Sequence, residues 1–245
     1  MYVSSSLPDY RCARTDFNVP TRSGARTSSF DYVKWRELEA RIAGGGPGEA
    51  DSSSWYANRP PVTASTVGAD ELWDNLEWFL RRVIPAAEAA GVRMAIHPDD
   101  PPFSPMFGVA RILLTPADMK RVVNIVDSPA NGITLCQGCF SQMGADIPGS
   151  ILEFADKINF VHMRDVVGNG ARFCEAFPDA GQTNMFEAIK AYRSVGYTGY
   201  MRADHVPAME GEEGPAHGYT MLGRLFAVGY IRGLLDAARV AKSGT

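Results

Sequence analysis

Four segments of the chain pass abruptly from an apolar run to side chains that bind metals or transfer protons. The segments are RMAIHPDD (93–100), GITLCQG (132–138), INFVHMRD (158–165) and GYMRADH (199–205). Their ends supply His97, Cys136, His162 and Asp204. Two imidazoles, a thiolate and a carboxylate are ligand types that divalent first-row metals bind. The four segments therefore predict a metal site, provided that the fold brings their ends together.

Each of these residues taken alone has a simpler interpretation. A single His or Cys after a strand is more often a buried side chain than a ligand. For the whole set, four consecutive apolar segments would each have to end on a ligand type by chance, so the set favours a metal site. Cys136 and Cys139 also form a CxxC, but no second CxxC follows, and the motif does not open a helix after the first strand. We expect Cys139 to be a bystander, and Cys12 and Cys174 to be small buried residues.

Helical patterns alternate with these segments along the chain. Apolar spacing predicts helices over 30–42, 70–90, 116–126, 147–155, 184–195 and 219–241. A short strand is expected at 2–3, before the four segments described above. Strands that alternate with helices predict an α/β fold with a parallel sheet and right-handed crossovers. Ligands in such folds bind at the carboxyl ends of the strands, so all four ligand residues should face one side of the sheet.

A Gly-, Ser- and Pro-rich segment over 44–68 separates the first two predicted helices. A loop of this length inside a compact domain is usually functional or disordered. Two interpretations stay open: a loop that folds over a site with Trp55 and Tyr56, or a disordered surface insertion. The chain over 1–245 is otherwise predicted to be a single domain.

The composition excludes several classes of protein. The 245 residues are 45% hydrophobic and 21% charged, which is enough apolar material for a sizeable core. A net charge of −4 predicts no binding to nucleic acid or to a membrane surface. No apolar run approaches the roughly 20 residues of a membrane-spanning helix, and the first residues lack the pattern of a secretory signal. Four cysteines in so long a chain predict no disulfide framework, and the expected location is the cytoplasm.

Charged residues near the ligands predict how a substrate is held. Asp99 and Asp100 follow His97, and either carboxylate would orient the imidazole through its second nitrogen. Arg164 is a candidate bidentate clamp for a substrate carboxylate, and Asp99 is a further candidate for a substrate contact. The weaker candidates are Arg14 and Arg111. Surface or structural ion pairs are the alternative for both arginines.

Two further groups are able to transfer protons. His205 lies beside Asp204, and Tyr219 lies just before the last predicted helix. Which of the two would act as base and which as acid stays open.

Several of these motifs resemble mannonate dehydratase, a metal-dependent lyase of hexuronate breakdown. The matching stretches are IHPDDPP, SPANGITLC, INFVHMRDV, MRADH and GYTMLGR followed by YIRGL. The resemblance implies a (β/α)8 TIM barrel of the xylose-isomerase type that holds Mn²⁺ or Fe²⁺. It implies these metal ligands: His97, Cys136, His162 and Asp204. It places His205 and Tyr219 at positions of acid–base chemistry. The implied reaction converts D-mannonate, a small sugar acid, to 2-keto-3-deoxy-D-gluconate and water.

The resemblance begins partway through the family pattern. About five βα units are predicted, which is too few to close an eight-stranded barrel, so we expect an incomplete barrel that corresponds to its C-terminal part. An open parallel sheet leaves edges that have to be covered. This predicts a homo-oligomer or a companion chain that supplies further strands.

Two other functions stay open. One is a sugar isomerase or epimerase of the same barrel superfamily, although such enzymes favour carboxylate-rich metal sites, and Cys136 counts against it. The other is a truncated, non-catalytic metal-binding barrel. The absent strands favour it, and the intact set of ligands and proton-transfer groups argues against it. The thiolate by itself favours iron, cobalt or zinc over manganese.

Overall fold

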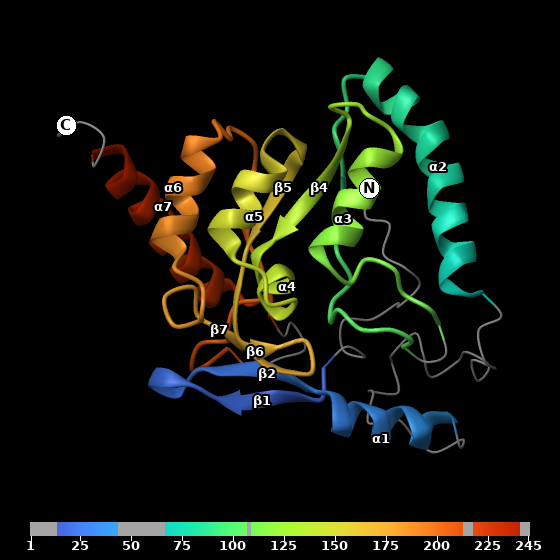
Figure 1. The fold of residues 1–245 in the computed structure, drawn as a ribbon. Helices are drawn as coiled ribbons and strands as arrows, with labels where there is room; N and C mark the ends of the chain where they lie inside the picture. The colour runs from blue at the N-terminus through green and yellow to red at the C-terminus, as the bar shows by residue number, and fades with distance from the viewer. Residues whose placement is uncertain (1–13, 44–66, 107–108, 213–217, 241–245) are drawn as a thin grey trace.

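The computed structural model describes residues 14–43, 67–106, 109–212 and 218–240. The strand predicted at 2–3, Cys12 and nearly all of the 44–68 segment lie outside these residues. Within them the chain forms two four-stranded sheets, one parallel and one antiparallel, together with seven α-helices (Figure 1). The α/β class and the parallel sheet expected from the sequence are confirmed.

The parallel sheet contains the four segments that end on ligand types. In the order in which they pair, its strands are β3 (Met94–Ile96), β4 (Asn131–Cys136), β5 (Ile158–Met163) and β8 (Met201–Ala203). Cys136 pairs with His162, and His162 pairs with Arg202. His97 and Asp204 directly follow β3 and β8. Because the strands are parallel, their carboxyl ends lie at one edge of the sheet, as predicted.

Helices precede, connect and follow these strands and cover the sheet (Figure 1). They are α2 (Ala69–Ala89), α3 (Pro116–Ile125), α4 (Gln137–Gln142), α5 (Ile147–Phe154), which runs into the 3-10 turn η3 (Ala155–Lys157), α6 (Met185–Ser194) and α7 (Met221–Val240). Thr115, Asp146 and Asn184 cap α3, α5 and α6, each accepting a hydrogen bond from the backbone N–H three residues later. None of the helices in the described ranges is both long and apolar enough to span a membrane.

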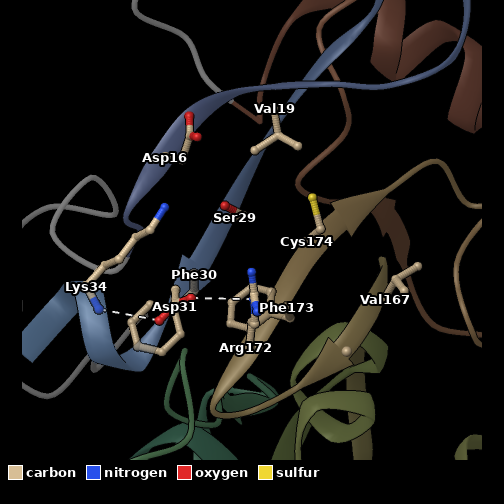
Figure 2. Close-up of a pocket in the computed structure, with 11 residues that line it drawn as sticks. Asp16, Val19, Ser29, Phe30, Asp31, Lys34, Val167, Arg172, Phe173 and Cys174 are labelled. Atoms are coloured by element: carbon tan, nitrogen blue, oxygen red, sulfur yellow. Dashed lines mark hydrogen bonds and ion pairs between the residues drawn. The ribbon is translucent and has the colours of Figure 1, made fainter.

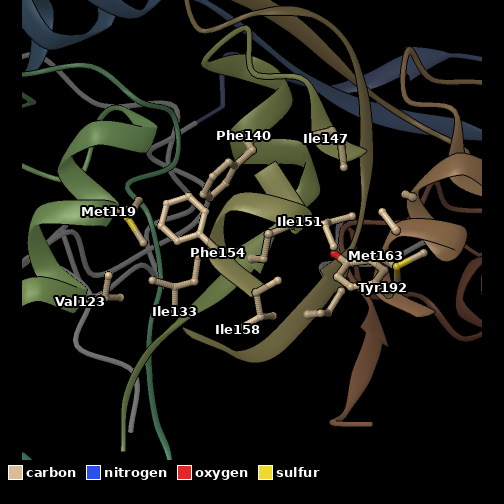
Figure 3. Packing of buried hydrophobic residues seen from close by; sticks show 14 of the residues in the cluster. Met119, Val123, Ile133, Phe140, Ile147, Ile151, Phe154, Ile158, Met163 and Tyr192 are labelled. Carbon is tan, nitrogen blue, oxygen red and sulfur yellow. The ribbon is translucent and has the colours of Figure 1, made fainter. Parts of the chain in front are cut away.

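The main hydrophobic core lies between the parallel sheet and these helices (Figure 3). Ile133, Leu135 and Val161 on the strands are fully buried, as are Phe140 on α4 and Ile151 on α5. Every residue of β4 is buried, as expected for a central parallel strand with both faces covered. This core fixes the strands, and it thereby fixes the positions of the residues at their ends.

A second sheet, which the sequence analysis did not predict, lies across the carboxyl ends of the parallel strands (Figure 1). In pairing order it contains β1 (Asp16–Pro20), β2 (Arg26–Asp31), β7 (Arg172–Ala176) and β6 (Asp165–Asn169), with a 3-10 turn, η2 (Arg22–Gly24), between β1 and β2. β6 begins two residues after β5 ends, so the two strands are hard to separate in the sequence. The helix predicted over 30–42 begins later, as α1 (Tyr32–Ala43), because Phe30 belongs to β2 and pairs with Phe173 of β7.

A smaller hydrophobic cluster supports this second sheet. Its buried members are Phe30, Trp35, Met106, Val166 and Phe173. The ring of Phe30 stacks on those of Phe103 and Phe173, with centroids 5.4 and 5.7 Å away. The guanidinium carbon of Arg14 lies 4.8 Å from the centroid of Phe173. The cluster therefore also supports a buried charge near the ends of the parallel strands.

We predict that Phe30→Ala lowers the free energy of unfolding by about 3–5 kcal/mol, because it removes a fully buried ring from the centre of this cluster. Urea unfolding followed by circular dichroism measures the change. Val33→Ala on α1 is the control, since Val33 is 65% exposed and should change stability by less than about 0.5 kcal/mol. Equal stabilities for the two variants would contradict the packing described.

Candidate metal and proton-transfer site

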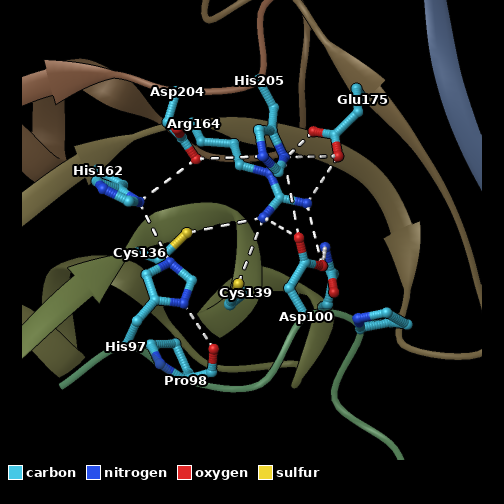
Figure 4. A network of polar contacts seen from close by, with 12 residues as sticks. His97, Pro98, Asp100, Cys136, Cys139, His162, Arg164, Glu175, Asp204 and His205 are labelled. Atoms are coloured by element: carbon cyan, nitrogen blue, oxygen red, sulfur yellow. Dashed lines mark hydrogen bonds and ion pairs between the residues drawn. The ribbon is translucent and has the colours of Figure 1, made fainter. Parts of the chain in front are cut away.

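The four predicted ligand residues converge at the carboxyl edge of the parallel sheet (Figure 4). Ligand atoms of Cys136, His162 and Asp204 all lie within 4.8 Å of one another. His162 Nδ1 is 3.3 Å from Asp204 Oδ2 and 3.2 Å from His97 Nε2. Two ligand atoms on one tetrahedral ion are roughly 3.3–3.8 Å apart. The residues present therefore fit a shared divalent ion.

Further contacts orient the ligands. His97 Nδ1 lies 2.6 Å from the carbonyl oxygen of Pro98, which leaves Nε2 facing the other ligands. Asp204 Oδ1 accepts a hydrogen bond from Arg202 Nη2 at 2.8 Å. The contact of His97 Nδ1 with Pro98 is typical of metal-binding histidines, which are usually held through their second nitrogen. A backbone carbonyl thus provides the contact that the sequence analysis expected from a neighbouring carboxylate.

The charges of the ligands stabilise one another. Burial raises the pKa of Cys136, but the hydrogen bond with Cys139 and the charge of His97 outweigh it, and the pKa lies well below its usual value. Burial lowers the pKa of His97, but the Cys136 thiolate outweighs burial, and the pKa is raised. Burial raises the pKa of Asp204, yet the neighbouring histidines lower it overall. Thiolate and carboxylate are the forms that bind a cation.

A largely buried network of two arginines and two carboxylates lies beside the candidate ligands (Figure 4). Glu175 Oε1 accepts hydrogen bonds from Arg14 Nη2 at 2.6 Å and from Arg164 Nη2 at 2.7 Å. Asp100 Oδ2 accepts from Arg14 Nη2 at 2.9 Å and from Arg164 Nη1 at 3.0 Å. Positive and negative groups therefore alternate around a closed ring, so that each buried charge is compensated by two partners.

This network keeps both carboxylates ionised. Burial raises the pKa of Glu175, but Arg164 and Arg14 outweigh burial and lower it to about 2. The same two guanidiniums hold the pKa of Asp100 well below its usual range, again against the effect of burial. Burial lowers the pKa of Arg164, but the two carboxylates raise it further than burial lowers it.

Arg164 also connects the network to the cysteines. Its Nη1 lies 3.3 Å from Cys139 Sγ and 3.7 Å from Cys136 Sγ. Gly138 leaves room for this side chain, because a Cβ at position 138 would lie 2.6 Å from Arg164 Cδ. The glycine between the two cysteines is thus required by the path of the arginine.

His205 and Tyr219, the residues predicted to transfer protons, are in contact. His205 Nε2 is 2.8 Å from the Tyr219 hydroxyl, and His205 Nδ1 is 3.3 Å from both Glu175 Oε1 and Arg14 Nη2. His205 Nε2 is also 3.6 Å from Asp204 Oδ2. The backbone of His205 has a φ of 49°, a left-handed conformation that costs energy for a residue with a Cβ and recurs at functional sites. The pair therefore lies between the charge network and the ligands.

Asp99 and Arg111 pair with each other. Arg111 Nε donates to Asp99 Oδ1 at 3.0 Å, and Asp99 Oδ2 accepts from the backbone N–H groups of Ile112 and Leu113 at 3.2 and 2.9 Å. Arg111 Nη1 donates to the carbonyl oxygen of Pro101 at 2.7 Å. These contacts hold the loop after β3 in a fixed conformation. They thereby place Asp100, the residue after Asp99, in the charge network.

Two residues of the site were missed or misjudged from the sequence. Glu175 was not predicted, although RFCEA (172–176) alternates so that Glu175 shares a strand face with the buried Phe173. That signal would have required β7 to be recognised as a strand. Cys139 was expected to be a bystander, yet its Sγ and the ligand atoms of His97 and Cys136 all lie within 4.8 Å of one another.

A separate cleft of about 450 Å³ lies on the antiparallel sheet (Figure 2). Phe30 and Phe173 contribute apolar surface to it, and Asp16, Lys34 and Arg172 contribute charged groups. No residue predicted for metal binding, proton transfer or substrate contact lines it. The cleft is therefore distinct from the site at the ends of the parallel strands.

The sequence of this chain is similar to those of known mannonate dehydratases. The family model described as D-mannonate dehydratase (UxuA) matches residues 5–244. A mannonate dehydratase of Streptococcus agalactiae is 41% identical over 247 residues, which cover 94% of this chain and 68% of the relative. The chain belongs to the D-mannonate dehydratase family. It spans between 48% and 68% of the length of the curated mannonate dehydratases compared with it at 41% identity.

The fold of this family member is also similar to those of solved structures. The crystal structure of mannonate dehydratase from Streptococcus suis serotype2 matches with a TM-score of 0.78 at 30% identity, covering 95% of this chain and 64% of that chain. A xylose isomerase-like TIM barrel protein from Mycobacterium smegmatis matches with a TM-score of 0.53 at 18% identity, covering 83% and 65%. The second match is a likeness of fold alone.

We predict that Glu175→Gln lowers the free energy of unfolding at neutral pH by about 3–5 kcal/mol, because two buried guanidiniums then share a single carboxylate. The native pKa of Glu175, about 2, lies below the unfolded value near 4.5. Its carboxylate therefore stabilises the fold above pH 4.5, and this contribution is lost as the pH falls toward 2. Urea unfolding at several pH values should show a smaller loss between pH 5 and pH 3 in the variant than in the wild type.

Glu153→Gln is the matched control for this prediction. Glu153 pairs with Lys120 at the surface, where its side chain is 46% exposed, so the same substitution should change stability by less than about 0.5 kcal/mol. If both variants lose the same stability, the charge network is not the structural element that we describe.

Proposed function

We propose that this protein catalyses the metal-dependent dehydration of D-mannonate to 2-keto-3-deoxy-D-gluconate and water, a carbon–oxygen lyase reaction. The observation that carries this proposal is the convergence of four ligand side chains beside the His205–Tyr219 pair. Membership of the mannonate dehydratase family supports the same substrate. Dehydration of a sugar acid requires a cation near the carboxylate, a base and an acid, and the site has groups for each.

The ion would be held by a set of four side chains: His97, Cys136, His162 and Asp204. The close ligand atoms of the set, together with the lowered pKa values of Cys136 and Asp204, support this assignment. When bound, a divalent ion would stabilise the negative charge that develops beside the substrate carboxylate as the neighbouring proton leaves. We assign Mn²⁺ or Fe²⁺ to the site, and the thiolate in the set favours Fe²⁺ of the two.

His205 and Tyr219 would transfer the protons. One group removes the proton on the carbon next to the carboxylate, and the other protonates the departing hydroxyl, which leaves as water. In the tautomer that carries its proton on Nδ1, His205 donates to Glu175 and accepts from the Tyr219 hydroxyl through Nε2. The 2.8 Å contact between the two groups lets a proton pass from one to the other, so the starting protonation is restored after each turnover.

The two buried arginines would position this pair. Arg164 donates from all three of its guanidinium nitrogens to two carboxylates, so its charge is already compensated. We therefore propose that Arg164 holds Glu175 against His205 instead of clamping the substrate carboxylate directly. For Asp99 and Arg111 we propose an equally indirect role, which is to hold the loop after β3 at the edge of the site.

We further propose that the parallel sheet forms part of a (β/α)8 barrel within a single domain, as the likeness to TIM-barrel structures supports. In the part of the chain that the structure describes, β3 and β8 each pair on one side only. Because open edges are normally covered, we propose that a second copy or a companion chain covers them. Free thiols in the site suit the reducing cytoplasm, where hexuronate breakdown would take place.

Turnover of D-mannonate should require an added divalent ion and should fall by about 100-fold or more in Cys136→Ala and Asp204→Asn, since each variant removes a ligand. The assay follows formation of the 2-keto acid by metal-free protein with added Mn²⁺ or Fe²⁺. Cys174→Ala is the control and should keep wild-type turnover. Equal turnover in the presence of a strong chelator would rule out metal dependence, and conversion of a neutral ketose but not of D-mannonate would favour an isomerase.

Tyr219→Phe should lower kcat by about 10²–10⁴-fold with little change in KM, because it removes a group that transfers a proton and leaves the metal ligands in place. Metal content per chain should stay at the wild-type value. Tyr200→Phe is the matched control, since Tyr200 is 80% exposed and should keep its activity. A kcat for Tyr219→Phe within a few-fold of wild type would remove Tyr219 from the mechanism.

A further inference from the structure

A fully buried thiol at the edge of the metal site has no part in the proposed reaction. Cys139 is 0% exposed, and its Sγ, Cys136 Sγ and a ring nitrogen of His97 all lie within 4.8 Å of one another. Figure 4 shows both sulfurs near the guanidinium of Arg164. A second sulfur so close to a metal ligand is a candidate ligand in its own right.

The local backbone explains why the two sulfurs meet. Cys136 is the last residue of β4 and the N-cap of α4, so strand and helix follow each other without a connecting loop. Cys139 lies in the first turn of α4, three residues later, and side chains at this spacing share one side of a helix. The CxxC spacing thus turns the second thiol back toward the strand end that carries the first.

Arg164 directs an N–H group toward both sulfurs. Its Nη1 lies 3.3 Å from Cys139 Sγ and 3.7 Å from Cys136 Sγ. N–H groups directed at sulfur are typical partners of metal-bound thiolates. A cation that binds the thiol also displaces its proton. Without a cation, burial and the neighbouring Cys136 raise the pKa of the Cys139 thiol well above its usual value, so the thiolate would form only with the ion bound.

We propose that Cys139 is an additional ligand, through which the site binds a thiophilic divalent ion such as Zn²⁺ or Co²⁺ with His97 and Cys136. The inference rests on the metal site of the proposed function. Ligand atoms on one tetrahedral ion are roughly 3.3–3.8 Å apart, so small side-chain rotations bring the three atoms to one ion. Two thiolates and an imidazole select zinc, cobalt or iron over manganese.

The site then contains two overlapping donor sets. Both use His97 and Cys136, but one adds the imidazole of His162 and the carboxylate of Asp204, and the other adds the thiolate of Cys139. Hard ions such as Mn²⁺ are bound through the set with an oxygen ligand, and soft ions through the set with two sulfurs. Cys139 thereby determines which ion the protein prefers.

Titration of the metal-free protein (residues 1–245) with Co²⁺ under anaerobic conditions tests this directly. Each thiolate bound to cobalt adds to a charge-transfer absorption in the near ultraviolet. The Cys139→Ser variant should keep roughly half of the wild-type absorption per bound cobalt, since one of two thiolates remains. Cys174→Ser is the matched control and should keep all of it. Zn²⁺ should remove the absorption at one equivalent, whereas an excess of Mn²⁺ should not.

The outcomes separate this inference from the proposed function. An absorption that Cys136→Ser weakens but Cys139→Ser leaves unchanged overturns the role of Cys139 and leaves the four-ligand site intact. Cobalt bound without any thiolate absorption, or no cobalt bound at all, overturns both. If Cys139→Ser fails to fold, X-ray absorption spectroscopy of the wild-type protein with bound Zn²⁺ gives the number of sulfur ligands directly. Two sulfur ligands per zinc are expected, and a single one overturns the inference.

Discussion

Two buried arginines, the buried Glu175 and the partly buried Asp100 join the antiparallel sheet to the carboxyl ends of the parallel strands. Arg14 precedes β1 and Glu175 lies on β7, whereas Asp100 follows β3 and Arg164 follows β5. Burying a charge costs several kcal/mol unless its partners are in place. The network is therefore stable only when both sheets are folded and in contact, and the site that depends on it forms as a single unit.

The two sheets make different contributions to the chemistry. The parallel sheet brings the ligands together, because its register sets Cys136 opposite His162 on adjacent strands. The antiparallel sheet supplies Glu175, which lies against His205 and connects the proton-transfer pair to the arginines. His205 follows Asp204 directly at the end of β8, so the antiparallel sheet contributes the carboxylate that contacts His205, and not the His205–Tyr219 pair itself. A change in the packing of the antiparallel sheet would therefore displace Glu175 from His205 and from the arginines.

The electrostatics of the site follow from the same arrangement. Glu175 and Asp100 compensate the arginines almost completely within the network, which leaves the ligand set to attract a cation with its own thiolate and carboxylate. Arg164 is shared between the two parts, since it contacts the network through its carboxylate partners and the ligand set through sulfur. Its position depends on Gly138, whose missing Cβ opens the path.

The sequence alone determined the parallel strands, most helices and the ligand types, because these features are local. An apolar run that ends on His162 or Cys136 can be recognised from its own residues, and parallel pairing then places such ends together. The antiparallel sheet and the role of Glu175 were decided only by the tertiary structure. β2 pairs with β7, whose residues lie far along the chain, and no local pattern specifies that pairing. Cys139 became a neighbour of the ligands only once β4 had turned directly into α4, because proximity in space depends on the path of the backbone.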